Sequence, residues 1–438
     1  MSNKNFKKRR FLIFSIFCLL FAMSLFLRSS TAVIAHDLME SFSISASTLG
    51  LMAAVYFWIY GCVQIPVGIL SDRIGIRHTV FLFGLIGVVG ALLFAFASTV
   101  QVAILARIIT GLGTACFWVP ALKFLSVFYL PHEFASLTSV ISSVANVGLV
   151  FSSYPLAFLV ERTNWRLPFL LSSAVLLVLV LLAWFLMDLK ADEAGQNKNN
   201  KKNEAETYNV NTGSESHSHS NIPKVSSRHK LKPAHYFSRY YKFIYFVIWS
   251  FFIYGILFAF QMLWGTAYLQ DVFSISRETA GANLMFTSFG LIVGGPLWGI
   301  ISDRFAKSRK PVIFWGTLGF LFTLLLFLLQ SHYWGFWLVS LIYFSFGFFG
   351  IVFLITITSV KEFFPLQITG TAIGILNTIM ILSVGFFQSA TGHFIERFYS
   401  SGFTAARVYY KVFLIFAVCI FIAIIISLLI PETYKQSR

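Results

Sequence analysis

Charged side chains are scarce in this sequence, and acidic ones are the scarcest. Only 11% of the 438 residues are charged and 17 are Asp or Glu, whereas 57% are hydrophobic and 51 are Phe. A soluble globular protein of this length has no interior large enough for that much apolar surface. The lack of charge therefore excludes a soluble protein and indicates a chain whose outer surface contacts lipid.

Cysteines and catalytic motifs are also nearly absent. The four cysteines lie far apart in apolar runs, a pattern that fits small buried hydrophobic side chains and not a disulfide framework or a metal site. The sequence has no HExxH motif and no phosphate-binding loop, and the serines at 29–30 have no paired base. We therefore expect no enzyme activity, no ATP-driven transport within this chain, no metal and no cofactor.

Twelve long apolar runs make up most of the chain. Because the hydrocarbon core of a bilayer is about 30 Å thick, a spanning helix needs about 20 apolar residues. The runs cover residues 11–35, 48–70, 79–98, 102–125, 137–160, 168–187, 243–269, 280–301, 312–330, 334–357, 368–391 and 409–430. The first is too long, and too polar at its end, for a cleavable signal. We predict an all-α membrane protein with twelve transmembrane helices.

The basic residues predict the orientation of the chain. The formal net charge is +16, and most Lys and Arg residues fall in segments on one side of the predicted membrane. Cytoplasmic loops of membrane proteins carry such an excess, so the charge does not require nucleic acid as a partner. We expect a multi-pass protein of a prokaryotic inner membrane, with both termini in the cytoplasm.

A polar segment divides the twelve runs into two sets of six. Residues 188–242 are rich in Asn, Ser and Lys and almost free of apolar side chains, a composition typical of disorder. We predict an N-terminal six-helix bundle at 1–187, a disordered cytoplasmic linker at 188–242 and a C-terminal six-helix bundle at 243–438.

A short motif recurs at the same place in both sets. Residues 67–78 read VGILSDRIGIRH and residues 298–309 read WGIISDRFAKSR, which align at an offset of 231 residues. An internal repeat at equivalent positions indicates two pseudo-symmetric halves. The pattern Gly-x-Leu-x-Asp-Arg-x-Gly after the second run resembles the signature loop of the major facilitator superfamily.

This resemblance implies the major facilitator fold and a conformational clasp between the cytoplasmic ends of the two halves. The clasp residues it implies are Gly68, Asp72, Arg73, Gly75, Arg77, Gly299, Asp303 and Arg304, with Ala306 replacing the later glycine of the second copy. Charge that merely sets topology is the alternative, but topology needs only Lys and Arg, and a carboxylate recurs here. Residues 27–38 resemble a branch that contains lysosomal dipeptide carriers and uncharacterised bacterial relatives.

Two arginines lie inside predicted spans that contain no acidic residue. An unpaired buried charge costs several kcal/mol, so water, backbone carbonyls, Asp37 or an anionic ligand must compensate Arg28 and Arg107. The family resemblance places their helices, the first and the fourth, at the central cavity. For Arg28 we favour a ligand role over snorkelling to the outer surface. Arg107 lies in a sequence that resembles the superfamily's Arg-x-x-x-Gly motif, and for this residue the sequence favours neither a structural role nor a ligand role over the other.

Aromatic and amide side chains complete the candidate substrate site. We take Tyr60, Trp118, Gln261 and Trp264 as one set with the two arginines, because a mostly apolar pocket uses a few polar groups to orient its ligand. The competing interpretation of each is ordinary helix packing or an interfacial aromatic belt.

These features predict a secondary transporter that moves a small organic anion or zwitterion, such as a carboxylate, amino acid or short peptide, by alternating access. A drug-proton antiporter is one alternative, although residues 145–160 lack the Gly-Pro antiporter motif of the family. A non-transporting membrane sensor with the same fold is another. The expected partners are a small-molecule substrate, a coupled proton or ion and the lipid bilayer. We expect the protein to be a monomer. Uniport and anion exchange are equally allowed.

Overall fold

Twelve helices long and apolar enough to cross a membrane are found in the part of the chain that the computed structural model describes, residues 3–187, 233–329 and 335–434. The prediction of a twelve-helix membrane protein is confirmed. Most of the linker predicted at 188–242 lies outside these residues.

The first half contains ten elements. They are α1 (Asn3–Ser29), η1 (Ser30–Ala32), α2 (Ala35–Phe42), α3 (Ala46–Ile74), α4 (Ile76–Ala95), α5 (Val100–Thr114), α6 (Trp118–Phe128), α7 (Pro131–Phe151), α8 (Tyr154–Arg162) and α9 (Arg166–Leu186). The second half also contains ten. They are α11 (Pro233–Ala259), η2 (Phe260–Trp264), α12 (Gly265–Phe273), α13 (Arg277–Ile300), η3 (Ile301–Ala306), α14 (Lys310–Leu329), α15 (Phe336–Gly350), α16 (Phe353–Phe363), α17 (Leu366–Ser400) and α18 (Ala405–Leu429).

Several spans differ from their predicted bounds. The eleventh, predicted to end at 391, continues to Ser400, and the seventh covers Tyr241–Phe273 where 243–269 was predicted. The fourth and tenth spans are each broken near the middle, at 115–117 and 351–352. Hydropathy cannot locate such breaks, because the residues on both sides are equally apolar.

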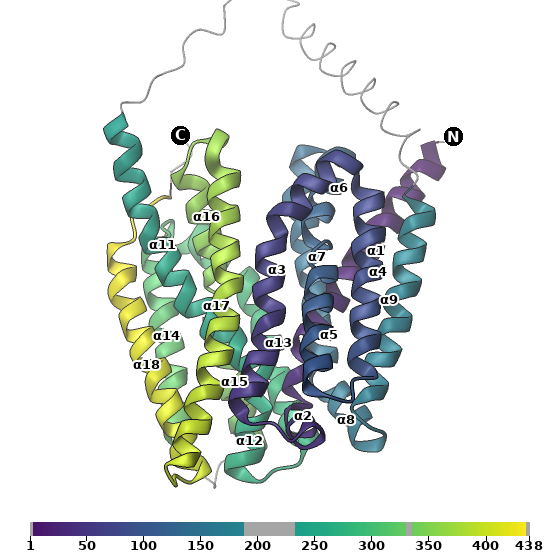
Figure 1. Ribbon diagram of the computed structural model, residues 1–438. Helices are drawn as coiled ribbons and strands as arrows, with labels where there is room; N and C mark the ends of the chain where they lie inside the picture. Colours follow the sequence, from purple (N-terminus) through teal and green to yellow (C-terminus); the bar gives the residue numbers. More distant parts are fainter. Residues whose placement is uncertain (1–2, 188–232, 330–334, 435–438) are drawn as a thin grey trace, which may run out of the picture.

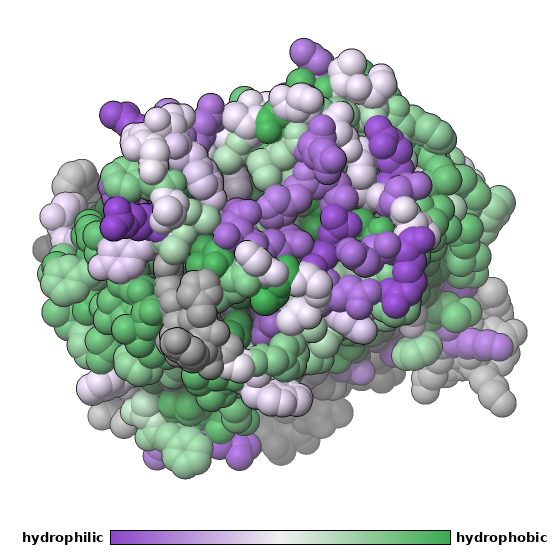
Figure 2. Space-filling view, turned by 90° about the horizontal axis from the view of Figure 1, so that it is seen from below, coloured by the Kyte–Doolittle hydropathy of each residue, from purple (hydrophilic) through white to green (hydrophobic). Residues whose placement is uncertain are grey.

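The helices form two bundles that lean against each other (Figure 1). The start of α1 and the end of α18 lie at one end of the molecule, called here the terminal face, and α2, α8 and α12 lie at the other end, the opposite face. Between the halves, α3 packs along α17, and α13 packs along α7 and α8. Figure 2 shows hydrophilic side chains across the opposite face and hydrophobic ones along its flanks, as expected for a protein surrounded by lipid.

Glycines permit the closest crossing between the halves. A Cβ atom on Gly50 of α3 would lie 2.6 Å from the carbonyl oxygen of Gln388 in α17, and one on Gly392 would lie closer still to that of Ala46. Such distances are shorter than any normal contact, so the two backbones approach only because these side chains are absent.

The repeated motif forms two different turns. In the first half Gly75, at φ +84°, is the only residue between α3 and α4. Its counterpart Ala306 ends the π-helical segment η3, and the positive φ passes to Lys307, at +45°. Lys307 also carries a Cβ, so the second turn bears a backbone cost that Gly75 avoids in the first.

Candidate functional site

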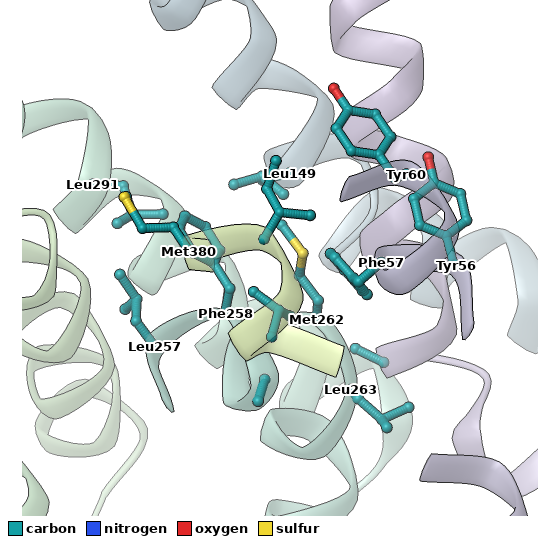
Figure 3. Packing of buried hydrophobic residues seen from close by; sticks show 14 of the residues in the cluster. Tyr56, Phe57, Tyr60, Leu149, Leu257, Phe258, Met262, Leu263, Leu291 and Met380 are labelled. Atoms are coloured by element: carbon teal, nitrogen blue, oxygen red, sulfur yellow. The ribbon is translucent and has the colours of Figure 1, made fainter. Parts of the chain in front are cut away.

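A cavity of about 170 Å³ lies between the two halves. Its lining is Phe21, Leu25, Arg28, Tyr60, Gln64, Trp118, Ser142, Ala145, Asn146, Tyr254, Phe258, Met262, Ile351, Phe353, Leu354, Ile357, Asn377, Met380 and Ile381. Figure 3 shows part of this region, where Phe258, Met262 and Met380 lie close together on one side and Tyr60 projects from α3 on the other. The site is therefore shared by both halves.

Arg28 is the single charged side chain among the described residues that line the cavity, and none of these is Asp or Glu. It lies in the last turn of α1 and is only 4% exposed. One terminal nitrogen donates to Ser24 Oγ at 3.0 Å, and the guanidinium carbon lies 3.9 Å from the centre of the Tyr60 ring. Its Nε is buried and has no hydrogen-bond partner among the residues that the structure describes. The aromatic face compensates part of the buried charge, and an unused donor remains.

Arg107 lies outside the cavity lining. Its NH1 donates to the carbonyl oxygen of Leu27 at 2.9 Å, and its guanidinium carbon lies 4.6 Å from the centre of the Tyr56 ring. Leu27 is in the last turn of α1, whose carbonyls have no partners within the helix, so Arg107 caps that end. The guanidinium of Arg28 lies 6.0 Å from the same Tyr56 ring, and the two arginines thus converge on a tyrosine.

The rest of the predicted set is divided. Tyr60 and Trp118 line the cavity, and Trp118 stacks on Phe21 with ring centres 4.9 Å apart. Gln261 and Trp264 do not line it. Gln261 Nε2 donates to Ser288 Oγ at 3.1 Å and Trp264 Nε1 to the carbonyl oxygen of Gln388 at 3.3 Å, so both tie helices together within the second half.

Two cavity residues outside that set connect the halves directly. Asn377 Nδ2 of α17 donates to Gln64 Oε1 of α3 at 2.8 Å. The sequence carries a signal for Gln64, which lies four residues after Tyr60 in an otherwise apolar helix. Nothing in the sequence indicates that Asn377 is its partner.

The helices around the cavity are interrupted beside it. Trp118 follows the break between α5 and α6, Ile351 lies in the break between α15 and α16, and Met262 lies in the π-helical η2. Irregular backbone at membrane depth is tolerated where it is buried or lines a cavity, and π-turns often mark functional sites.

Both carboxylates of the implied clasp form ion pairs within their own halves in this structure. Asp72 Oδ1 forms an ion pair with Lys123 Nζ at 2.9 Å. Arg77 Nε donates a hydrogen bond to the carbonyl oxygen of Trp184 at 2.9 Å. In the second half Asp303 pairs with Arg309, which also binds Glu362 at 2.7 Å. Arg73 and Arg304 are exposed, Gly75 is the turn between α3 and α4, and Gly68 and Gly299 lie within helices. No clasp between halves is formed among the described residues.

The opposite face, by contrast, carries the ion pairs that join the halves. Arg277 of α13 pairs with Asp37 of α2 at 2.9 Å, and Glu278 pairs with Arg162 of α8 at 2.6 Å. Asp37 therefore compensates Arg277 and not Arg28. Despite that partner, burial raises the pKa of the Asp37 carboxyl.

A histidine bridges the halves beside these pairs. His36 Nε2 lies 2.8 Å from Asp271 Oδ1 and its Nδ1 lies 2.9 Å from Gln270 Oε1, both on α12. Tyr409 of α18 donates to the other oxygen of Asp271 at 2.7 Å. The hydrogen bond to Asp271 raises the pKa of His36, although burial acts against it.

Comparison with known proteins shows relatives that transport organic anions. The chain is 24% identical to the probable sulfoacetate transporter SauU of Cupriavidus necator over 386 residues. The match covers 85% of this chain and 84% of that protein. It is 23% identical to the hexuronate transporter of Bacillus subtilis, over 66% of this chain and 63% of that protein. It is 28% identical to the D-galactonate transporter of Escherichia coli O6:H1, over 36% of each.

A solved structure shares the fold. A bacterial homologue of the human lysosomal transporter Spinster, in an inward-facing and unoccupied conformation, matches with a TM-score of 0.72 and 16% identity, over 98% of this chain and 99% of that one. The sequence model of the Major Facilitator Superfamily matches residues 12–276 and 247–438, which is nearly the whole chain. This multi-pass membrane protein is therefore a transporter of the Major Facilitator Superfamily.

Proposed function

We propose that this protein is a secondary transporter that moves a small organic anion across the membrane, and that Arg28 binds the anionic group. The observation that carries the proposal is the charge of the cavity: its described lining contains one guanidinium and no carboxylate. A buried cation without a counter-ion is costly, and a bound anion removes that cost.

The relatives support the same substrate class. Sulfoacetate, hexuronate and D-galactonate, the substrates in the names of three relatives, are all organic anions. A zwitterion is a weaker candidate, because its ammonium group would find no carboxylate among the described lining residues. A cationic drug would in addition be repelled by Arg28, which counts against a drug-proton antiporter.

We further propose that transport proceeds by alternating access and that the terminal face is cytoplasmic in a prokaryotic inner membrane. Basic residues are concentrated at the terminal face, as the positive-inside rule requires. The cross-half ion pairs at the opposite face, and the pairing of the clasp carboxylates Asp72 and Asp303 within their own halves among the described residues, support an inward-facing state.

Thermal unfolding tests the binding proposal directly. A ligand that binds only the folded state stabilises it by about 2.7 kcal/mol at 100 times its dissociation constant. We expect carboxylates or sulfonates to raise the melting temperature of the wild type and to fail on Arg28→Gln. Arg166→Gln is the matched control, because Arg166 is exposed and lies outside the cavity lining, where its side chain donates to the carbonyl oxygen of Ala97 and lies over the ring of Trp165.

Two results would contradict the proposal. One is equal stabilisation of both proteins by cationic drugs, and the other is unchanged anion binding in Arg28→Gln. Counterflow of a labelled anion in liposomes separates a transporter from a non-transporting sensor, which would bind the anion without exchanging it.

A further inference from the structure

The two walls of the cavity differ in chemistry. The first half contributes the polar side chains, among them Arg28, Gln64 and Asn146. The wall from the second half is apolar apart from Tyr254 and Asn377, and that asparagine already donates to Gln64. The site thus offers a charged and polar wall to one end of a ligand and an apolar wall to the other.

The apolar wall is built from packed side chains. Phe258 packs against Tyr254 with ring centres 4.5 Å apart, and Phe353 meets Tyr254 edge-on with ring centres 4.8 Å apart. Met262, Leu354 and Met380 complete it. Hydroxyl groups placed against such a surface lose their hydrogen bonds to water and gain none in return, which disfavours a polyhydroxylated ligand.

The volume sets the size of the ligand. An apolar cavity of about 150 Å³ in another protein holds one molecule of benzene. A site of about 170 Å³ has room for a single ring or a short branched chain together with a small anionic group.

We infer that the substrate is a singly charged anion with a compact apolar body, whose carboxylate or sulfonate binds Arg28 while its ring or branched chain contacts the wall of Phe258, Met262 and Leu354. This inference rests on the proposed function and narrows it. It separates this protein from its sugar-acid-transporting relatives, because the second wall offers few hydrogen-bonding groups to the hydroxyls of a sugar acid.

A matched pair of ligands tests the inference. Cyclohexanecarboxylate and D-glucuronate both carry one carboxylate on a saturated six-membered ring, and they differ mainly in hydroxylation. We would titrate each into the full chain in lipid nanodiscs and measure the dissociation constant by calorimetry, with empty nanodiscs and neutral cyclohexanecarboxamide as controls. We expect cyclohexanecarboxylate to bind about tenfold more tightly or better, and the amide not to bind.

The outcomes distinguish this inference from the proposed function. Equal or tighter binding of D-glucuronate would overturn the apolar substrate class and leave anion transport standing. If neither ring acid binds and sulfoacetate does, the apolar class is likewise wrong. If no anion binds, both proposals fail together.

Two variants of Leu354 test whether the second wall causes the preference for cyclohexanecarboxylate over D-glucuronate. Leu354 is 39% exposed, so replacing it should not prevent folding, which the melting temperature checks. Leu354→Asn keeps the size of the side chain and adds an amide, and we expect it to reduce the preference for cyclohexanecarboxylate several-fold. Leu354→Ala should weaken the binding of cyclohexanecarboxylate but reduce the preference less than Leu354→Asn does, because the wall loses a contact and stays apolar. An unchanged preference in Leu354→Asn would show that this wall does not touch the ligand.

Discussion

At the scale of single residues, the two buried arginines solve the same electrostatic problem in different ways. Arg28 lies over Tyr60 and lines the cavity, whereas Arg107 caps the end of α1 and lies against Tyr56 outside it; among the described residues Nε of Arg28, and Nε and NH2 of Arg107, have no hydrogen-bond partner. A lysine has one compact charge and cannot both reach the Leu27 carbonyl and cover the ring as a planar guanidinium does. Arg107→Lys should therefore destabilise the fold by about 1–3 kcal/mol, the usual worth of a charge-assisted hydrogen bond.

The same variant should leave the binding site intact. We expect the melting temperature to fall while the dissociation constant of a bound anion stays within about twofold of wild type, since Arg107 does not line the cavity. A loss of affinity as large as that of Arg28→Gln would instead place Arg107 in contact with the ligand.

The sequence could predict which candidate residues line the cavity only where the helix that carries them is regular. Tyr60 and Gln64 lie four residues apart on the long helix α3 and both line the cavity, as the regular spacing of that helix allows. Gln261 and Trp264 share a stripe only if their helix is regular, but η2 is a π-turn. An extra residue in a turn rotates the rest of the helix by about 100°, and Met262 faces the cavity instead. Such a π-turn depends on tertiary packing, which hydropathy does not report.

At the scale of elements, the two copies of the loop motif allow a direct comparison of backbone cost. Gly75 has φ +84° and ψ 162°, a conformation open almost only to glycine. Gly75→Ala should cost about 1–3 kcal/mol. Gly299→Ala is the control, because its Cβ would meet no atom within 4 Å, and it should be neutral or slightly stabilising in its helix. Melting temperatures of the two variants in one detergent give the comparison.

In the second copy of the loop motif, substitution to glycine should stabilise the fold. Lys307 has a left-handed backbone at φ +45°, which costs a residue with a Cβ about 1–2 kcal/mol. Lys307→Gly should recover part of that cost and raise the melting temperature. If Gly75→Ala proves harmless and Lys307→Gly destabilises, the turn geometry does not determine stability at this face.

At the scale of the whole molecule, the number of spans and the division into halves followed from hydropathy and the repeated motif, because both depend on local sequence alone. The conformational state of the transporter could not be predicted from the sequence, since it depends on which charged residues of the two halves form ion pairs. Asp37 was a candidate partner for Arg28 and instead binds Arg277, 240 residues away in the chain. In the proposed inward-facing state such pairs hold the opposite face closed, and one of them contains a histidine.

That histidine makes closure of the opposite face sensitive to pH. The pKa of His36 is raised in the closed state, chiefly by its hydrogen bond to Asp271, and should return toward its ordinary value of about 6.5 when the halves separate. The proton therefore favours closure: the stabilisation is complete below about pH 6.5 and is lost as the pH rises through the raised pKa. The other charged groups around it are Asp37 on α2 and Arg277 on α13, with Tyr409 of α18 bound to Asp271. Protonation of Asp37, whose pKa is also raised, acts in the same direction at lower pH.

Spin labels at exposed positions 40 and 401, one on each half in a cysteine-free background, would follow the opening of this face. We expect the fraction with a long distance to grow as the pH is raised from 6 to 8.5. Each tenfold difference in proton affinity between the two states permits at most a tenfold change in their ratio. His36→Gln can still donate a hydrogen bond to Asp271 but cannot take up a proton, so its distance distribution should not change over this range. If the variant responds to pH as the wild type does, the titrating group is another one, and the pair of His36 and Asp271 is only a structural contact.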